Sequence, residues 1–137
     1  MRNALSTPQS EAALPFSTAV WAGDLLFVSG QASVDESGVY VEDTFEGEFR
    51  RSIAKLQEIL SWAGLSMDDV VQVTAYLADE SDRAEYNALY RGTFAVPYPA
   101  RTSIVCGIAN LKFELDAVAY RSKSPESRLE QGEEEHG

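Results

Sequence analysis

The sequence predicts an α+β domain in which two helices cover one face of a mixed β-sheet. Two observations carry this prediction. Short runs rich in β-branched and aromatic residues alternate along the chain with two longer segments, whose apolar residues recur every three or four positions. The predicted order of elements is β-β-α-β-α-β-β, an order that favours helices packed on one side of a sheet.

The first two strands form a predicted hairpin. Two apolar runs, 19–22 and 25–29, flank Gly23-Asp24, a pair typical of tight hairpin turns. Gly30 follows the second run, and a glycine there indicates a sharp bend or a place where a ligand lies close to the backbone. Residues 35–38 are predicted to form the next turn.

The first helix is predicted to begin near Phe45. Its apolar residues form one stripe because they lie three or four positions apart: Phe45, Phe49, Ile53, Leu56, Leu60 and Ala63. Thr44 is suited to cap the N-terminus through its hydroxyl. Gly64 is suited to end the helix, because glycine adopts the left-handed conformation of a helix C-terminus at little cost.

The second half of the chain is predicted to add three strands and one helix. Residues 70–77 are rich in β-branched residues and indicate a buried strand. Residues 82–85 have the spacing of a capping box and open a helix that runs to about Phe94, where two nearby prolines prevent its continuation. The last two strands are predicted at 100–106 and 112–120.

One face of the predicted sheet has no helix to cover it. We expect two sets of alternating side chains to share that open face: Arg101, Ser103 and Val105 from one strand, and Glu114, Asp116, Val118 and Tyr120 from the other. A face that mixes charged and apolar groups on so small a domain favours contact with other copies of the chain. The sequence therefore predicts a homo-oligomer with pockets between subunits.

Length and charge limit the class of protein. The chain has 137 residues and a net charge of −11, which fits one domain with a modest core. Residues 1–121 are predicted to form that domain, and the acidic segment 122–137 to be a disordered tail. The acidic balance disfavours nucleic-acid binding. Because no apolar run is long enough for a signal peptide or a membrane span, we expect a cytoplasmic protein with no membrane partner.

Cysteine and histidine usage narrows the chemistry. Cys106 is the only cysteine and His136 the only histidine. An intramolecular disulfide, a zinc site built on cysteine pairs and a histidine-based nucleophilic triad are therefore excluded. Without a histidine partner, Cys106 is better interpreted as a buried apolar residue than as a nucleophile. We expect neither a metal nor another cofactor.

An arginine and a glutamate are the strongest candidates for chemistry. Arg101 and Glu114 each lie in a strand-like run. A fixed guanidinium can bind a carboxylate through two hydrogen bonds, and a carboxylate within reach of a water can take its proton. A structural ion pair between these two residues is the alternative that the strands alone leave open.

Short motifs follow one another in a fixed order along residues 12–120: Leu14-Pro15-Phe16, Val28-Ser29-Gly30-Gln31, Ala63-Gly64-Leu65, Asn87-Ala88-Leu89-Tyr90 with Phe94, Pro99-Ala100-Arg101, and Phe113-Glu114-Leu115-Asp116-Ala117-Val118-Ala119. In this order the chain resembles the RidA (YjgF-type) family of enamine/imine deaminases. The resemblance implies a chorismate-mutase-like (bacillus-type) fold and a homotrimer with an active site at each subunit interface. It also implies the hydrolysis of small, carboxylate-bearing 2-enamino or 2-imino acids to 2-keto acids and ammonia, without a cofactor.

The resemblance also assigns roles to residues. Arg101 matches the family arginine that binds the substrate carboxylate, and Glu114 the glutamate that positions or activates water. The resemblance implies five further substrate-binding positions: Phe16, Ser29, Gly30, Asn87 and Ser103. Phe16 stands where many members have tyrosine, Ser103 where many have cysteine, and the interval from Arg101 to Glu114 is slightly shorter than in the common pattern. Asp116 is an alternative to Glu114 for handling water.

Three other functions remain open from the sequence. The same arginine pocket could hold a metabolite or keto acid without turning it over. The departures at Phe16 and Ser103 leave room for a pathway-specific deaminase or another hydrolase. An RNA-cleaving activity, sometimes attributed to such proteins, is disfavoured by the acidic composition and by the lack of a histidine in the predicted domain.

Overall fold

A computed structural model describes residues 2–7 and 14–122 of the chain. The sheet contains β1 (Asn3–Ala4), β2 (Ala19–Ala22), β3 (Leu25–Ala32), β4 (Val70–Leu77), β5 (Ala100–Val105) and β6 (Phe113–Tyr120). The helices are α1 (Phe45–Trp62) and α2 (Arg83–Thr93), with single 3₁₀ turns at η2 (Met67–Asp69) and η3 (Glu80–Asp82). Apart from its first residue, the predicted tail at 122–137 lies outside the described residues, as does His136.

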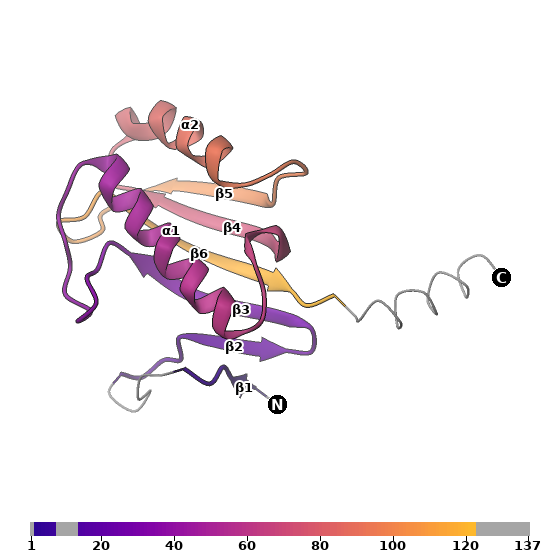
Figure 1. Cartoon of the computed structure of the whole chain (residues 1–137). Coiled ribbons are helices and arrows are strands. Elements are labelled where there is room, and N and C mark those ends of the chain that lie inside the picture. The colour runs from indigo at the N-terminus through magenta and orange to yellow at the C-terminus, as the bar shows by residue number, and fades with distance from the viewer. Residues whose placement is uncertain (1, 8–13, 123–137) are drawn as a thin grey trace.

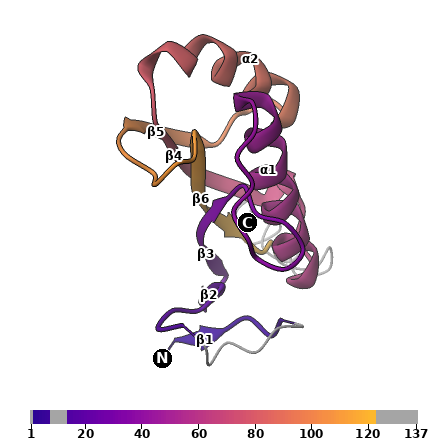
Figure 2. The ribbon, with the colours of Figure 1, turned by 90° about the vertical axis from the view of Figure 1, so that its left-hand side faces the viewer.

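The six strands form one sheet in the order β1-β2-β3-β6-β4-β5, with both helices on one face (Figures 1 and 2). β4 and β5 pair in parallel, and the other neighbours are antiparallel. The predicted mixed sheet with two helices on one face is therefore confirmed. The short strand β1, which pairs with β2, was not predicted, because two residues are too few to show alternation.

Both predicted ends of α1 are confirmed. The Thr44 hydroxyl accepts a hydrogen bond from the Gly47 N–H at 3.1 Å. At the other end Gly64 has φ +74°, and its N–H donates to the Ser61 carbonyl at 3.1 Å. The Leu65 N–H donates to the Leu60 carbonyl at 2.8 Å, which completes a Schellman motif. Local sequence signals alone thus determine where this helix begins and ends.

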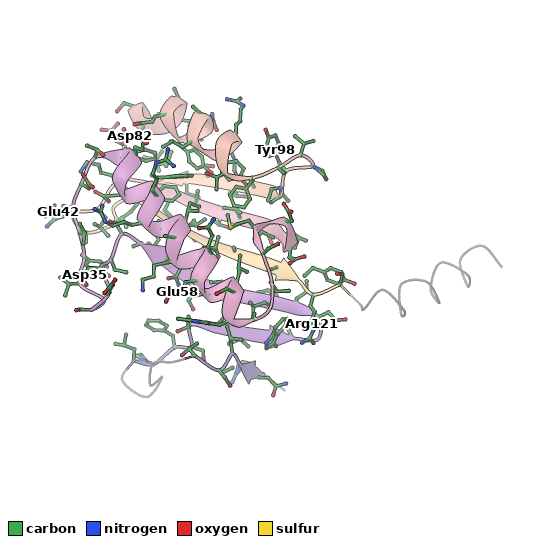
Figure 3. All side chains as sticks on the ribbon, viewed as in Figure 1. Asp35, Glu42, Glu58, Asp82, Tyr98 and Arg121 are labelled. Carbon is green, nitrogen blue, oxygen red and sulfur yellow. The ribbon has the colours of Figure 1, made fainter. Side chains whose placement is uncertain are left out.

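The predicted capping box at the start of α2 is wrong. Asp82 makes no side-chain capping hydrogen bond; Figure 3 labels it at the N-terminal end of the helix. Asp79 acts instead, since its carboxylate accepts from the Ser81 N–H at 2.8 Å and begins η3. The helix follows η3 directly, so its first turn is organised by a cap three residues earlier than the spacing predicted.

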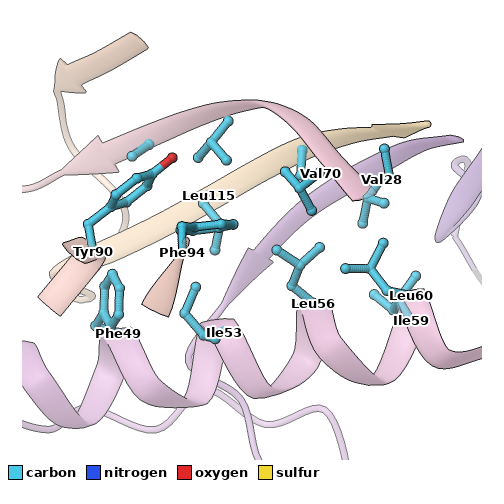
Figure 4. Close-up of a cluster of buried hydrophobic side chains, with 14 of the residues drawn as sticks. Val28, Phe49, Ile53, Leu56, Ile59, Leu60, Val70, Tyr90, Phe94 and Leu115 are labelled. Carbon is cyan, nitrogen blue, oxygen red and sulfur yellow. The ribbon is translucent and has the colours of Figure 1, made fainter. Parts of the chain in front are cut away.

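The core lies between the sheet and α1 (Figure 4). The stripe on α1 and the alternate residues of β6 pack there, fully or almost fully buried: Phe45, Phe49, Ile53, Leu56, Ile59 and Leu60 from α1, and Phe113, Leu115, Ala117 and Ala119 from β6. On β4 only one face is buried, while Val71 and Gln72 are exposed. β4 is therefore a central strand covered on one side, rather than the buried strand predicted.

Arg101 and Glu114 lie on opposite faces of the sheet, and the prediction that Arg101, Ser103 and Val105 share the open face is wrong. Arg101 pairs with Val73 and Ser103 with Ala75, both of which are buried under the helices. Glu114 instead pairs with Tyr76 on the uncovered face. Alternation shows which residues of one strand share a face, but the pairing register decides which face it is.

The open face carries Glu114, Asp116, Val118 and Tyr120, as predicted for β6. Four large apolar side chains on this face are each at least one-third exposed: Leu25, Phe27, Ile104 and Tyr120. The predicted homo-oligomer would cover such a face, and it stays a prediction. Among the described residues, no helix combines the length and the apolar character that a membrane crossing requires.

Candidate active site

Arg101 is held at the edge of the sheet against α2. Its Nη2 donates to the Asn87 side-chain carbonyl at 2.9 Å. Its guanidinium carbon lies 4.7 Å from the ring centroids of both Tyr86 and Tyr90, within the range of cation–π attraction. A neutral amide and two aromatic rings thus orient the guanidinium without cancelling its charge, and no described carboxylate lies within ion-pair distance of it.

The sequence of α2 explains how Tyr86, Asn87 and Tyr90 come to surround the Arg101 guanidinium, a group of residues called the Arg101 cradle below. Tyr86 and Tyr90 lie one helical turn apart, so both rings face the sheet. Burial raises the pKa of Tyr86, although Ser103 and Arg101 oppose that effect, and burial raises the pKa of Tyr90 to about 12. Both rings are therefore neutral near pH 7. The Ser103 hydroxyl donates to the Tyr86 hydroxyl at 3.2 Å, so Ser103 supports the Arg101 cradle from β5.

A pocket of about 260 Å³ opens beside Arg101, lined by Asn87, Tyr90, Arg91, Tyr98, Pro99 and Arg101. Tyr98 comes from the loop between α2 and β5 (Figure 3). The resemblance implied roles for Asn87, Arg101 and Ser103, and the structure brings these three residues together. It adds Arg91, which lies four residues after Asn87, and the pair Tyr86 and Tyr90, which are also four residues apart on α2. These spacings could have been noticed in the sequence.

Glu114 occupies a second site on the open face. Its carboxyl group lies against Gly30 so closely that a Cβ on Gly30 would collide with it. The pairing of β3 and β6 shifts register between Val28 and Gln31, so Gly30 sits at a β-bulge. The bend predicted at Gly30 is therefore confirmed, and the group that approaches its backbone is a side chain of the same chain.

Asp116 is a neighbour of Glu114 with a different role. The Tyr76 hydroxyl donates to the Asp116 carboxylate at 2.8 Å, which raises the pKa of Tyr76 to about 12, with burial adding to the effect. Glu114 makes no side-chain hydrogen bond within the described part of the chain. Burial raises the pKa of Glu114, and repulsion from Asp116 raises it further. Of the two carboxylates, Glu114 is thus the one free to bind a water.

The surroundings of Glu114 are largely apolar. A cavity of about 500 Å³ is lined by Phe16, Phe27, Val28, Ser29, Gly30, Glu114, Asp116, Ala117 and Val118. Phe16, Ser29 and Gly30 were all predicted for the site, and the structure gathers them around Glu114. The Ser29 hydroxyl donates to the Ser17 carbonyl at 2.6 Å, so it fixes the segment that leads into the hairpin.

The structure therefore forms two clusters rather than one site. Arg101 lies level with Val73 and Glu114 with Tyr76, on strands separated by β4. Two strand spacings and three residues along the strands put their Cα atoms about 14 Å apart, and their side chains point to opposite faces. The alternative of a structural ion pair between them is excluded. Within one chain, Arg101 and Glu114 are thus too far apart for one small molecule to contact both.

A family model described as endoribonuclease L-PSP matches residues 6–121. The chain belongs to this family. This membership confirms the RidA-type resemblance, because proteins similar to this chain are named as deaminases. The 2-iminobutanoate/2-iminopropanoate deaminase of Mus musculus is 32% identical over 123 residues, covering 87% of this chain and 91% of the relative.

Two further relatives extend the match. The protein mmf2 of Schizosaccharomyces pombe, named as mitochondrial, is 36% identical over 110 residues, covering 77% of this chain and 86% of its own. The crystal structure of RidA from the Antarctic bacterium Psychrobacter sp. PAMC 21119 superposes with a TM-score of 0.74 at 28% identity, covering 80% of this chain and 91% of that one. The sheet with two helices is thus the fold of a solved RidA-family protein.

One buried residue that the sequence analysis missed, Glu48, supports the strand that carries Glu114. Glu48 is fully buried, and its carboxylate accepts hydrogen bonds from the backbone N–H of Lys112 at 2.8 Å and of Asp43 at 3.1 Å. The Lys112 ammonium lies 3.3 Å from the same carboxylate. Because Lys112 directly precedes β6, Glu48 fixes the start of the strand that carries Glu114. The signal was available: Glu48 interrupts the apolar stripe of α1.

Proposed function

We propose that the protein hydrolyses reactive 2-imino or 2-enamino acids to 2-keto acids and ammonia. Membership of the RidA-type family supports this, as do relatives named as deaminases. The observation that carries the proposal is the state of the two candidate groups. Arg101 is held in place with no carboxylate partner within the described chain, and Glu114 is held against Gly30 with its carboxyl group free.

Arg101 binds the substrate carboxylate in this proposal. Its guanidinium is oriented by Asn87 and stacked on two neutral rings, so its remaining N–H donors are available for a carboxylate. Asn87 is then a positioning residue for Arg101, rather than the direct substrate contact expected from the resemblance. Because the guanidinium keeps its geometry without a bound anion, little ordering is needed when substrate binds.

Glu114 handles water. Attack of water on the carbon of the protonated imine forms a C–O bond and breaks the C=N π bond, whose electron pair stays on nitrogen, while one water proton passes to the Glu114 carboxylate. Glu114 then returns that proton to the nitrogen of the carbinolamine, and the C–N bond breaks as the hydroxyl group loses its proton and becomes the keto group, so that ammonia leaves and a 2-keto acid remains. A 2-enamino acid enters the same sequence after it tautomerises to the imine. A raised pKa brings the carboxyl group closer to the working pH, where a group of this kind accelerates proton transfer by about 10²–10⁴-fold.

The proposal requires the site to lie between subunits, and we propose a homotrimer. Arg101 and Glu114 face opposite sides of one sheet, so Arg101 of one copy must meet Glu114 of another. The apolar side chains exposed on the open face, Phe27 and Ile104 among them, support burial of that face in an assembly. Sedimentation equilibrium tests this directly, and a strictly monomeric species at micromolar concentration would contradict it.

The activity is tested with a 2-imino acid released in solution by an amino-acid oxidase. We expect the protein to accelerate loss of the imine and Arg101→Ala to abolish that acceleration. Arg50→Ala is the matched control, since Arg50 is an exposed arginine of α1 that pairs with Glu46 and does not line the pocket beside Arg101. No acceleration by the wild type, or full activity in Arg101→Ala, would refute the proposed reaction.

A non-catalytic role is the second candidate, because Arg101 could hold a keto acid without turnover. A keto acid that raises the melting temperature, combined with no imine hydrolysis, would favour binding alone. RNA cleavage, which the description of the family model names, is tested by incubation with single-stranded RNA. We expect no cleavage, because the chain carries a net charge of −11. The cytoplasm remains our proposed location, to be tested by cell fractionation.

A further inference from the structure

The pocket beside Arg101 contains a second arginine that the proposed reaction does not use. Arg91 lies in the last turn of α2, four residues after Asn87 and therefore on the same face of the helix. Asn87 orients Arg101, and Arg91 lines the pocket one turn further along. Two guanidinium groups thus border one cavity of about 260 Å³, a size suited to a small metabolite rather than to a drug-sized ligand.

The pairing of the other cations makes this arrangement unusual for the chain. Within the described part of the chain, six cationic side chains form ion pairs with carboxylates: Arg50, Arg51, Lys55, Arg83, Lys112 and Arg121. Arg2, Arg91 and Arg101 have no ion pair with a described residue. Of the three cations that have no carboxylate partner among residues 2–7 and 14–122, two line the same pocket, in a chain whose net charge is −11.

We propose that this pocket selects 2-imino acids that carry a second carboxylate on the side chain. Arg101 binds the carboxylate next to the imine, and Arg91 binds the carboxylate at the far end of the side chain. Two like charges facing one cavity repel each other, and a dianionic ligand relieves that repulsion at both ends. The inference rests on the proposed function, because it names the substrate class of the same site.

The geometry also separates the acidic end of such a substrate from the reacting end. The Glu114 cavity has an apolar wall that includes Phe16, Phe27 and Val118, which offers no partner to a second carboxylate. The arginine pocket contains cations, Asn87 and the exposed Tyr98, and no acidic side chain. A side-chain carboxylate is therefore stabilised near Arg91 and disfavoured near Glu114.

The test compares two substrates of equal chain length, 2-iminoglutarate and 2-iminopentanoate, released by amino-acid oxidases from glutamate and norvaline. We expect the wild type to prefer 2-iminoglutarate by about tenfold or more in kcat/KM, the scale of one charge-assisted hydrogen bond. Arg91→Gln should remove that preference through KM and leave 2-iminopentanoate nearly unchanged. Arg50→Gln also removes one exposed positive charge, but outside the pocket, and should keep the preference.

Three results would overturn the inference: no preference in the wild type, a preference retained in Arg91→Gln, or an equal loss on both substrates, which would assign Arg91 to the carboxylate next to the imine. Calorimetry with 2-oxoglutarate and 2-oxopentanoate separates this inference from the reaction itself. Tighter binding of 2-oxoglutarate that depends on Arg91, without hydrolysis of either imine, would refute the reaction and keep the subsite. Hydrolysis of both imines without discrimination would keep the reaction and refute the subsite.

Discussion

Glu48→Gln tests the buried carboxylate that fixes the start of β6. The substitution keeps the size of the side chain but replaces one acceptor oxygen by an NH₂ group. That group then faces donors, because the carboxylate receives the N–H groups of Asp43 and Lys112 and the Lys112 ammonium. Losing one hydrogen bond to a charged acceptor and weakening another costs about 3 kcal/mol. The ion pair adds little, since the Lys112 side chain is 43% exposed.

The assay is chemical denaturation followed by circular dichroism, at one fixed subunit concentration because assembly would shift the midpoint. For a domain of this size, about 3 kcal/mol corresponds to a loss of roughly 10 °C in melting temperature. Glu46→Gln is the matched control, since Glu46 lies in the same first turn of α1 but is exposed and paired only with Arg50. It should cost no more than about 1 kcal/mol.

The comparison isolates burial, because both variants remove one negative charge from the same end of the same helix. Equal stability of Glu48→Gln and Glu46→Gln would refute the reasoning, since the network around Glu48 would then contribute nothing measurable. A loss of stability without any change in kcat would keep the network but remove its link to Glu114, which lies two residues after Lys112.

Three further predictions concern the two clusters. The Gly30→Ala variant should fold with little loss of stability, because the φ of Gly30 is not positive. Its added Cβ should displace the Glu114 carboxyl group and lower kcat. The control is Gly107→Ala, where a Cβ meets nothing within 4 Å, and it should leave kcat unchanged. Asp116→Asn keeps an acceptor for the Tyr76 hydroxyl but removes the charge repulsion that raises the pKa of Glu114. The acid limb of the kcat–pH profile should therefore move to lower pH. A shift to higher pH would contradict the role of Glu114. Arg101→Lys keeps the charge but loses the planar guanidinium that stacks on Tyr86 and Tyr90. We expect KM to rise by about tenfold or more, with a smaller change in kcat. An unchanged KM would show that a positive charge alone is enough to bind the substrate.

Several parts of the fold could be read from the sequence because their causes are local. The ends of α1 follow from Thr44 and Gly64, each acting on backbone groups within a few residues. The alternation of β6 and the turn at Gly23-Asp24 are equally local. The start of α2 shows the limit of such signals. Asp79 and Asp82 are both acceptable caps in sequence, and the hydrogen bond to Ser81 decides for Asp79.

The membership of the two clusters was partly predictable as well. The motifs named Phe16, Ser29, Gly30, Asn87 and Ser103 as positions of a single site. The structure divides them, with the first three beside Glu114 and the last two near Arg101. The sequence could not show which of Glu114 and Asp116 handles water, because both carboxylates lie on one face of one strand. Tyr76 separates them, and it reaches Asp116 only because β4 pairs beside β6.

The sequence by itself determined the family, both α-helices, every strand except β1, and the two residues that carry the proposed chemistry, since these depend on patterns within short stretches. Only the tertiary structure decided that Arg101 and Glu114 face opposite sides of the sheet. Which residues of a strand share a face is a local property of the sequence. Which side of the sheet that face lies on depends on the register of the strand with another strand that is distant in the chain. Glu48 shows the same limit: its place on the apolar stripe of α1 marks it in the sequence, but its partner Lys112 lies 64 residues further along the chain.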